Sequence, residues 1–185
     1  CFEILKGHPE SFPFAVSSLF SIKDKEAILV ISQNIVSYIT EIDPSESLGQ
    51  ILKALVIYND NCEICSYLTQ VVFFCSTNEN TYDPLMKYIN KLANTCIKHI
   101  KNVNICRAVV GVICNLSDTS HYIQQLLNTQ LCLIMALKSH PNDVQLVTAA
   151  SVCISNFAIS GKGKFFVDAI PILILALKNR TKLDT

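Results

Sequence analysis

Apolar residues recur along the chain at spacings of three and four positions, in stretches that proline, asparagine and aspartate interrupt. Within residues 102–117 the apolar positions follow an i, i+4, i+7, i+8, i+11 spacing, which places them on one side of an α-helix. Alternation of Val, Ile and Thr between glycine turns, the pattern of a sheet, does not occur. The sequence therefore predicts an all-α protein.

Short polar breaks divide this pattern into the helices that we expect. They cover residues 10–22, 23–42, 45–58, 61–75, 84–101, 102–117, 120–128, 131–140, 143–158, 161–167 and 169–178. Breaks are predicted at 43–44, 59–60 and 76–83, and Pro141 ends the helix before it because proline cannot continue a helix. Asn61, Asn102 and Asp143 stand where N-caps are expected.

The segment 102–117 recurs 41 positions later, at 143–158. Apolar residues coincide at 105/146, 109/150, 112/153, 113/154 and 116/157, and Asn115 coincides with Asn156. A shift of 41 positions the other way reaches 61–76, where Asn61, Ile64, Cys65 and Ser76 match their counterparts. Three copies at one period predict repeated units, each with a short, a middle and a longer helix.

Before residue 61 two registers stay open. Residues 5–9 resemble residues 137–141, which makes 10–22 a further copy of the longer, third helix. Residues 46–48 also resemble 10–12, which makes 45–58 a third helix and displaces the 41-residue register at Asn61.

The ends of the two clearest copies, Ile-Cys-Asn-Leu-Ser at 113–117 and Ile-Ser-Asn-Phe-Ala at 154–158, resemble the end of the third helix of the armadillo repeat. Ala-Ile-Pro-Ile-Leu at 169–173 resembles the start of that family's second helix. The resemblance covers residues 102–180, and a HEAT-type hairpin repeat remains an alternative for the N-terminal half. The chain departs from the family where a glycine usually precedes the second helix: Asn128-Thr129 and Val167-Asp168 stand there, and Asn can take the left-handed turn that Gly provides.

This resemblance implies a right-handed α-solenoid of about four stacked repeats, with residues 1–185 as one repeat segment and the third helices lining a concave face. It also implies a non-enzymatic scaffold or adaptor that binds a protein or peptide there. In peptide-binding members, the equivalent asparagine binds the ligand's main chain and a Trp four residues earlier stacks on its side chains. The positions here are Asn115 and Asn156, with Gly111 and Val152 four residues earlier, and these four are the predicted partner-binding residues.

From the residues alone, the favoured role of each asparagine is structural, which is to satisfy a backbone group near its own helix end, and contact with a ligand's main chain is the alternative. The chain contains no Trp, so the family's slots for basic side chains are missing and binding of nuclear-import cargo is not expected. A structural spacer or oligomerisation segment remains the alternative function.

Composition narrows the partners further. Half of the 185 residues are hydrophobic, 16% are charged, and 15 basic residues balance 15 acidic ones. Because the net charge is zero, the chain has no overall positive charge to attract nucleic acid or an anionic membrane. The longest run without a polar side chain, 169–177, is far shorter than the roughly 20 residues of a membrane span. We expect a soluble protein whose partner is recognised by apolar and uncharged polar contacts, with self-association possible through exposed repeat ends.

The nine cysteines lie mostly in apolar runs and are odd in number, which indicates buried, reduced thiols in a cytoplasmic protein. No signal-peptide pattern opens the chain, and residue 1 is Cys, so we expect a segment of a longer protein.

Cys62-Glu63-Ile64-Cys65 is the motif with the most chemical potential, and a thiol-redox protein is the less favoured alternative function. A zinc site needs a second such pair or two suitably spaced histidines, and neither is present. Residues 161–164, Gly-Lys-Gly-Lys, lack the spacing of a phosphate loop and predict a solvated turn, while His8 and His140 precede prolines between helices. We therefore expect no catalytic residue, no cofactor and no metal ligand.

Overall fold

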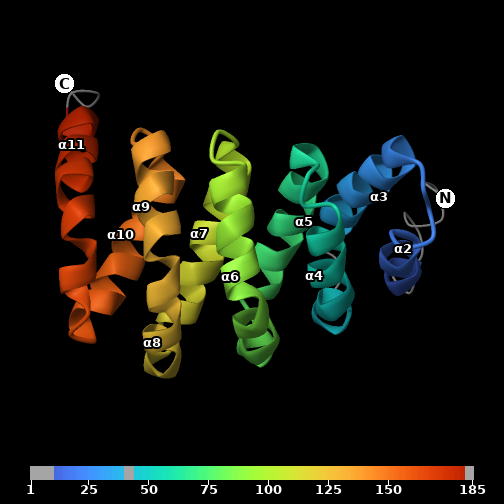
Figure 1. Ribbon diagram of the computed structural model, residues 1–185, viewed down its shortest axis with the longest axis horizontal. Helices are drawn as coiled ribbons and strands as arrows, with labels where there is room; N and C mark the ends of the chain where they lie inside the picture. The colour runs from blue at the N-terminus through green and yellow to red at the C-terminus, as the bar shows by residue number, and fades with distance from the viewer. Residues whose placement is uncertain (1–10, 40–43, 182–185) are drawn as a thin grey trace. The chain divides into compact units, whose positions relative to one another are not determined.

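The structure, a computed structural model, describes residues 11–39 and 44–181. Within these ranges every regular element is an α-helix or a 3-10 helix, and no strand occurs, which confirms the predicted all-α class. The chain divides into two compact units, residues 1–88 and 89–185, and helix α6 crosses the boundary (Figure 1). No helix in the described ranges is both long and apolar enough to cross a bilayer.

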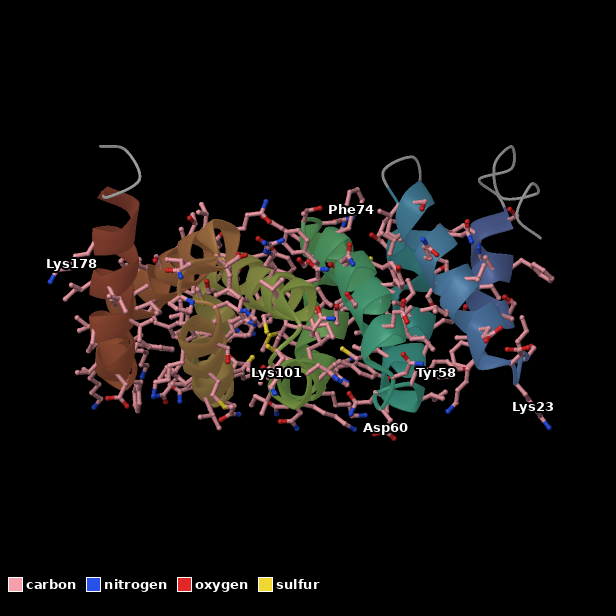
Figure 2. The ribbon with its side chains drawn as sticks, turned by 90° about the horizontal axis from the view of Figure 1, so that it is seen from above. Lys23, Tyr58, Asp60, Phe74, Lys101 and Lys178 are labelled. Atoms are coloured by element: carbon pink, nitrogen blue, oxygen red, sulfur yellow. The ribbon has the colours of Figure 1, made fainter. Side chains whose placement is uncertain are left out.

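Unit 1 is built around the packing of α5 against α3 and α4. Its elements are α2 (Phe12–Ser18), α3 (Lys25–Tyr38), the 3-10 helix η2 (Pro44–Ser47), α4 (Leu48–Ile57), α5 (Cys62–Cys75), η3 (Glu79–Thr81) and the first residues of α6 (Tyr82–Lys98). Leu19, Ile28, Ile35, Leu55 and Leu68 form part of its core and are almost fully buried. The Tyr58 hydroxyl, just after α4 (Figure 2), donates to the backbone oxygen of Leu19 at 2.5 Å.

Unit 2 is built around the packing of α10 against α7. After the second part of α6 come α7 (Val103–Ser117), η4 (Ser120–Tyr122), α8 (Ile123–Leu126), η5 (Leu127–Thr129), α9 (Gln130–Ser139), α10 (Val144–Ile159), η6 (Gly163–Ala169) and α11 (Ile170–Thr181). The 3-10 helix η6 packs on α9, α10 and α11. Phe157 of α10 meets Phe166 of η6 with ring centroids 4.6 Å apart, both fully buried.

The 41-residue period predicted from the sequence is present in the helix boundaries. Helices α5, α7 and α10 begin at residues 62, 103 and 144, and the 3-10 helices η3 and η4 begin at 79 and 120. The three predicted N-caps are confirmed: the side chains of Asn61, Asn102 and Asp143 each accept a hydrogen bond from the backbone N–H three residues later, at 3.1, 3.2 and 2.9 Å. One sequence signal thus starts the same helix three times.

One repeat position differs between copies. Residues 82–98 form the single helix α6, whereas the segment 41 positions later is broken into α8, η5 and α9. Asn128 does not take the left-handed turn that asparagine can adopt, because no non-glycine residue in the described ranges has a positive φ. Asn128 instead lies within η5, which joins α8 to α9 by tight right-handed turns.

In the N-terminal region the structure favours neither of the two open registers, because a different segment, α3, carries the same kind of cap as α5. Helix α3 is capped by Asp24, whose carboxylate accepts from the N–H groups of Glu26 and Ala27, as Asn61 does for α5. Helix α2 has seven residues and no side-chain cap. The N-terminal counterpart of α5 is therefore α3 rather than the segment 10–22, and α4 ends before the Asn61 cap without displacing the register. Residues 5–9 and 40–43, on which part of these predictions rested, lie outside the described residues.

Smaller boundary differences have local causes. Helix α6 begins at Tyr82 rather than at Pro84, because a proline in the first turn loses no helical hydrogen bond. It ends at Lys98 rather than at 101, and a turn at 99–101 leads to the Asn102 cap. The predicted turn at 161–164 is confirmed at its start: Gly161 has a φ of +74° and ends α10, and the N–H groups of Gly161 and Lys162 donate to the oxygens of Ala158 and Phe157 at 2.9 and 2.7 Å.

Candidate partner-binding site

The candidate site lies on α7 and α10, which carry the four predicted partner-binding residues. Arg107, in the first half of α7, binds Asp143 immediately before α10. At the other end, Asn156 of α10 binds Ser117 and Asp118 at the end of α7. Since the starts of the two helices are tied together and so are their ends, α7 and α10 run parallel and in register.

The contact at the helix starts is an ion pair that also serves as a helix cap. The Arg107 Nε lies 2.9 Å from Asp143 Oδ1 and 3.0 Å from Oδ2, and the terminal nitrogen Nη2 also donates to Oδ2. The same carboxylate accepts from the N–H of Leu146 at 2.9 Å. The hydrogen bonds from Arg107 have the largest effect and hold the pKa of Asp143 below its usual value; burial opposes them, and the hydrogen bond from the Leu146 N–H adds to the lowering.

The contact at the helix ends uses the side-chain amide of Asn156. Its Nδ2 donates to the Ser117 hydroxyl at 3.0 Å and to Asp118 Oδ1 at 2.7 Å. The expected role as a local backbone partner is therefore not what these contacts show, because both acceptors are side chains from the preceding repeat unit. Asn156 holds neighbouring third helices together.

The four predicted residues differ in their access to solvent. Gly111 is buried, Val152 is 45% exposed, and Asn115 and Asn156 are half-buried. Gly111 follows Arg107 by one helical turn and precedes Ser117 by less than two, so it lies near the side of α7 that meets α10. Gly111 is therefore the one residue of these four that is buried.

Between the two ends, the helices meet through cysteines. Burial first, and then the negative charge of Asp118, raises the pKa of Cys114 on α7 to about 11. Burial raises the pKa of Cys153 on α10 to about 12, although a hydrogen bond with Ser117 opposes the shift. Thiols with such pKa values stay protonated near neutral pH, so they act as packing groups.

A second pair of thiols lies deeper in unit 2. The sulfurs of Cys96 and Cys106 are 3.6 Å apart in a hydrogen bond, and both side chains are fully buried. That hydrogen bond, together with burial, raises the pKa of Cys106 far above its usual value. For Cys96 the bond with Cys106 lowers the pKa, but a hydrogen bond with Cys132 and burial outweigh it and the net shift is upward.

The Cys62–Cys65 pair of the redox alternative is split by the helix that carries it. Cys62 is the exposed first residue of α5, whereas Cys65 is fully buried and its thiol donates to the backbone oxygen of Tyr58 at 3.3 Å. Cys106, its counterpart in the next copy, donates in the same way to the oxygen of Ile100 at 3.4 Å. The buried cysteine thus has the same role in two copies, where it holds the turn before α5 and the turn before α7, whereas Val147 stands at this position in α10.

The remaining candidate groups have structural contacts. A ring nitrogen of His140 lies 2.7 Å from the backbone oxygen of Ile100 and joins two inter-helix turns of unit 2. His8 lies outside the described residues. Among residues 11–39 and 44–181, no cluster of three or more His, Cys, Asp or Glu side chains is arranged to hold a metal ion.

Sequence reasoning missed Arg107, Ser117 and Asp118, the residues on α7 that bind α10. A signal was present for Arg107: it is the only charged residue within α7, and α10 contains none. A single charge in an otherwise uncharged helix needs a partner, although its position along the chain does not say which one.

Comparison with protein-family models, with curated proteins and with solved structures finds no match for this chain. The class that the fold defines is an all-helical protein in which α5, α7 and α10 begin at a 41-residue period. Membership of the armadillo family stays a prediction that rests on the residues quoted from the sequence.

Proposed function

We propose that this chain is a non-enzymatic protein-interaction module of the armadillo-like solenoid type, which binds an extended segment of a partner protein along α7 and α10. The observation that supports it most is the parallel, in-register pairing of these helices, tied at both ends by Arg107–Asp143 and Asn156–Asp118. This pair of helices carries Asn115 on α7 and Asn156 on α10 at equivalent repeat positions, and since the N–H group of Asn156 binds α7, its side-chain oxygen is the group that would bind the main chain of an extended ligand.

The partner's chemistry follows from the charge of these helices. Helix α10 carries no charged residue, and Arg107, the one charge on α7, is already paired with Asp143. An uncharged surface gives little electrostatic steering, so the ligand is recognised by apolar contacts and by amide hydrogen bonds. We place the protein in the cytoplasm, which suits the buried thiols of Cys65, Cys75, Cys96, Cys106, Cys132 and Cys153.

A peptide-display selection tests this function. A library of random linear peptides displayed on phage is selected against the folded chain, and the affinity of enriched peptides is measured by fluorescence polarisation. We expect uncharged peptides that bind the chain and lose at least about tenfold in affinity when Asn115→Ala and Asn156→Ala are combined, since two hydrogen-bonding amides are lost.

The matched control is Asn128→Ala, which removes an exposed asparagine of the same unit in η5. It should leave peptide affinity unchanged. Circular dichroism shows whether the double variant is still folded, because Asn156 also stabilises the helix pair. The proposal is wrong if no peptide is enriched, or if the double variant and the control bind the same peptides equally well.

A further inference from the structure

The zero net charge of the chain conceals a division between its two units. Residues 1–88 contain eleven acidic and five basic residues, whereas residues 89–185 contain four acidic and ten basic residues. Unit 2 is therefore strongly basic on its own. A charge excess of this kind attracts partners of the opposite sign, even when the chain as a whole is neutral.

Four lysines of this excess lie at one edge of unit 2, where helices end and the next ones begin. Helices α6, α9 and α11 all end at this edge, which is uppermost in Figure 1. Lys98, Lys138 and Lys178 stand near these three helix ends at intervals of 40 residues, and Lys101 lies in the turn before α7. All four side chains are exposed, and together we call them the lysine edge.

A hydrogen bond shows that two turns of this edge are neighbours. A ring nitrogen of His140, just after α9, lies 2.7 Å from the backbone oxygen of Ile100, just after α6. The segments 97–107 and 137–147 contain one acidic residue, Asp143, and its charge is already paired with Arg107. The lysines of the two turns therefore add their charges on adjacent loops.

The opposite edge of unit 2 does not share this excess. Asp118 follows the end of α7 there, and Lys162, Lys164 and Asp168 follow the end of α10. Two basic and two acidic residues balance each other at this edge. The positive charge is thus concentrated on one side of the unit.

Helix stability explains only part of the lysine edge. A lysine in the last turn of a helix interacts favourably with the carbonyl groups there, which suits Lys98 and Lys138. Lys101 lies outside any helix, so this effect does not account for it. The edge also differs from the open side of α11: helices that stack on a repeat cover the sides of its helices, whereas the turns at its edge stay in solvent.

We propose that the lysine edge binds an acidic segment of a partner protein, whose Asp and Glu carboxylates lie against the lysine ammonium groups. Neighbouring helices lie about 10 Å apart, so three helix ends span roughly 20 Å. About six residues of an extended chain cover that length. The contact is separate from the uncharged ligand proposed for α7 and α10, and it does not depend on that function.

The composition of the edge favours an acidic peptide over other anionic partners. Residues 98–104 and 138–144 contain no Phe, Tyr or Trp. Single-stranded nucleic acid therefore finds no aromatic ring on which its bases stack, and a lipid surface finds no aromatic anchor. Exposed lysines without aromatic neighbours are suited to carboxylates, which they contact one at a time.

Fluorescence polarisation of a labelled acidic peptide tests the lysine edge on the whole chain. The probe is a peptide of about ten residues in which Glu and Ser alternate, long enough to span the row. Lys101→Gln combined with Lys138→Gln should weaken its binding about three- to tenfold, because two exposed ion pairs are lost. Lys101→Glu combined with Lys138→Glu should weaken it more than about tenfold, since attraction becomes repulsion. Added salt should weaken binding to the wild type, because it screens exposed charges.

The matched control is Lys162→Gln combined with Lys164→Gln, which removes the same charge from the opposite edge and should leave the affinity unchanged. The proposal is overturned if the acidic peptide binds no better than its counterpart with Gln in place of Glu, or if the two Lys→Gln pairs weaken it equally. It is also overturned if an oligothymidine or phosphatidylserine vesicles bind through Lys101 and Lys138 more tightly than the peptide does. Asn115→Ala combined with Asn156→Ala should leave the acidic peptide bound, so failure here and failure of the proposed function are distinguishable.

Discussion

The guanidinium of Arg107 binds the carboxylate of Asp143 in a two-pronged contact, and that carboxylate is also the N-cap of α10. One side chain thus begins a helix and ties that helix to the previous copy of the repeat. Asp143 is therefore both the start signal of α10 and a contact between two copies of the repeat.

The two roles of Asp143 can be separated by substitution. Asp143→Asn keeps an oxygen that caps α10 but removes the ion pair, and since Arg107 is 39% exposed we expect a loss of about 1 kcal/mol or less in the free energy of unfolding. Asp143→Ala also removes the cap, which adds about 1 kcal/mol. Urea unfolding measures both, and equal losses for the two variants would show that the cap contributes nothing.

The depressed pKa of Asp143 makes the contribution of the ion pair dependent on pH. A carboxyl whose pKa is lower in the folded state stabilises the protein above its unfolded value of about 4, and this stability is lost as the pH falls through the folded pKa. The difference in unfolding free energy between wild type and Asp143→Asn should therefore be constant near neutral pH and shrink below about pH 4. Urea titrations across this range check the sign, and a difference that grows on acidification would contradict the assignment.

The amide of Asn156 predicts a charge-dependent effect at the other end of the helix pair. Asn156→Asp replaces the donor 2.7 Å from Asp118 Oδ1 with a second carboxylate. We expect it to destabilise the fold by about 1 kcal/mol more than Asn156→Ala, because two like charges then lie in contact. Adding Asp118→Asn should restore most of this difference in thermal unfolding, and a pair of variants whose effects simply add would disprove the contact.

Two glycines of similar solvent access predict opposite outcomes. Gly161 adopts a φ of +74° at the end of α10, where any side chain is strained, so Gly161→Ala should cost about 1 kcal/mol. Gly49 lies in α4 with nothing within 4 Å of an added Cβ, so Gly49→Ala should be neutral or stabilise by up to about 1 kcal/mol. Thermal melting of the two variants compares them, and a loss of stability in both would point to a general effect of adding a methyl group.

The sequence predicted the all-α class, the caps of α5, α7 and α10, and the period that relates them, because these depend on residues close together along the chain. It did not resolve the register before residue 61, where a likeness between residues 5–9 and 137–141 favoured the wrong segment. The cap at Asp24 identifies α3 as the counterpart, and that requires the side-chain hydrogen bonds of the structure.

At the candidate site, the sequence located Asn115 and Asn156 by their shared position but gave no indication of what Asn156 binds. Its acceptors Ser117 and Asp118 are 39 and 38 residues away, and a contact at that separation depends on how the helices stack. Gly111 and Val152 occupy equivalent positions in the repeat, so the sequence did not show that Gly111 is buried and Val152 is exposed. That difference also depends on how the helices stack.

The central claim is that 41 residues form one structural unit, and removal of one unit tests it most directly. Deleting residues 103–143 joins Asn102 to Val144, so that Asn102 takes over as the cap of α10. The account predicts a folded protein with undiminished helical content per residue and a cooperative urea transition, because stacked repeats depend on their neighbours and not on total length. Deleting 103–145 instead joins Asn102 to Leu146 and rotates the apolar side of α10 by about 200° relative to the cap, so it should clearly lower the stability. If the two deletions behave alike by circular dichroism and urea unfolding, the 41-residue unit is not the building block of this fold.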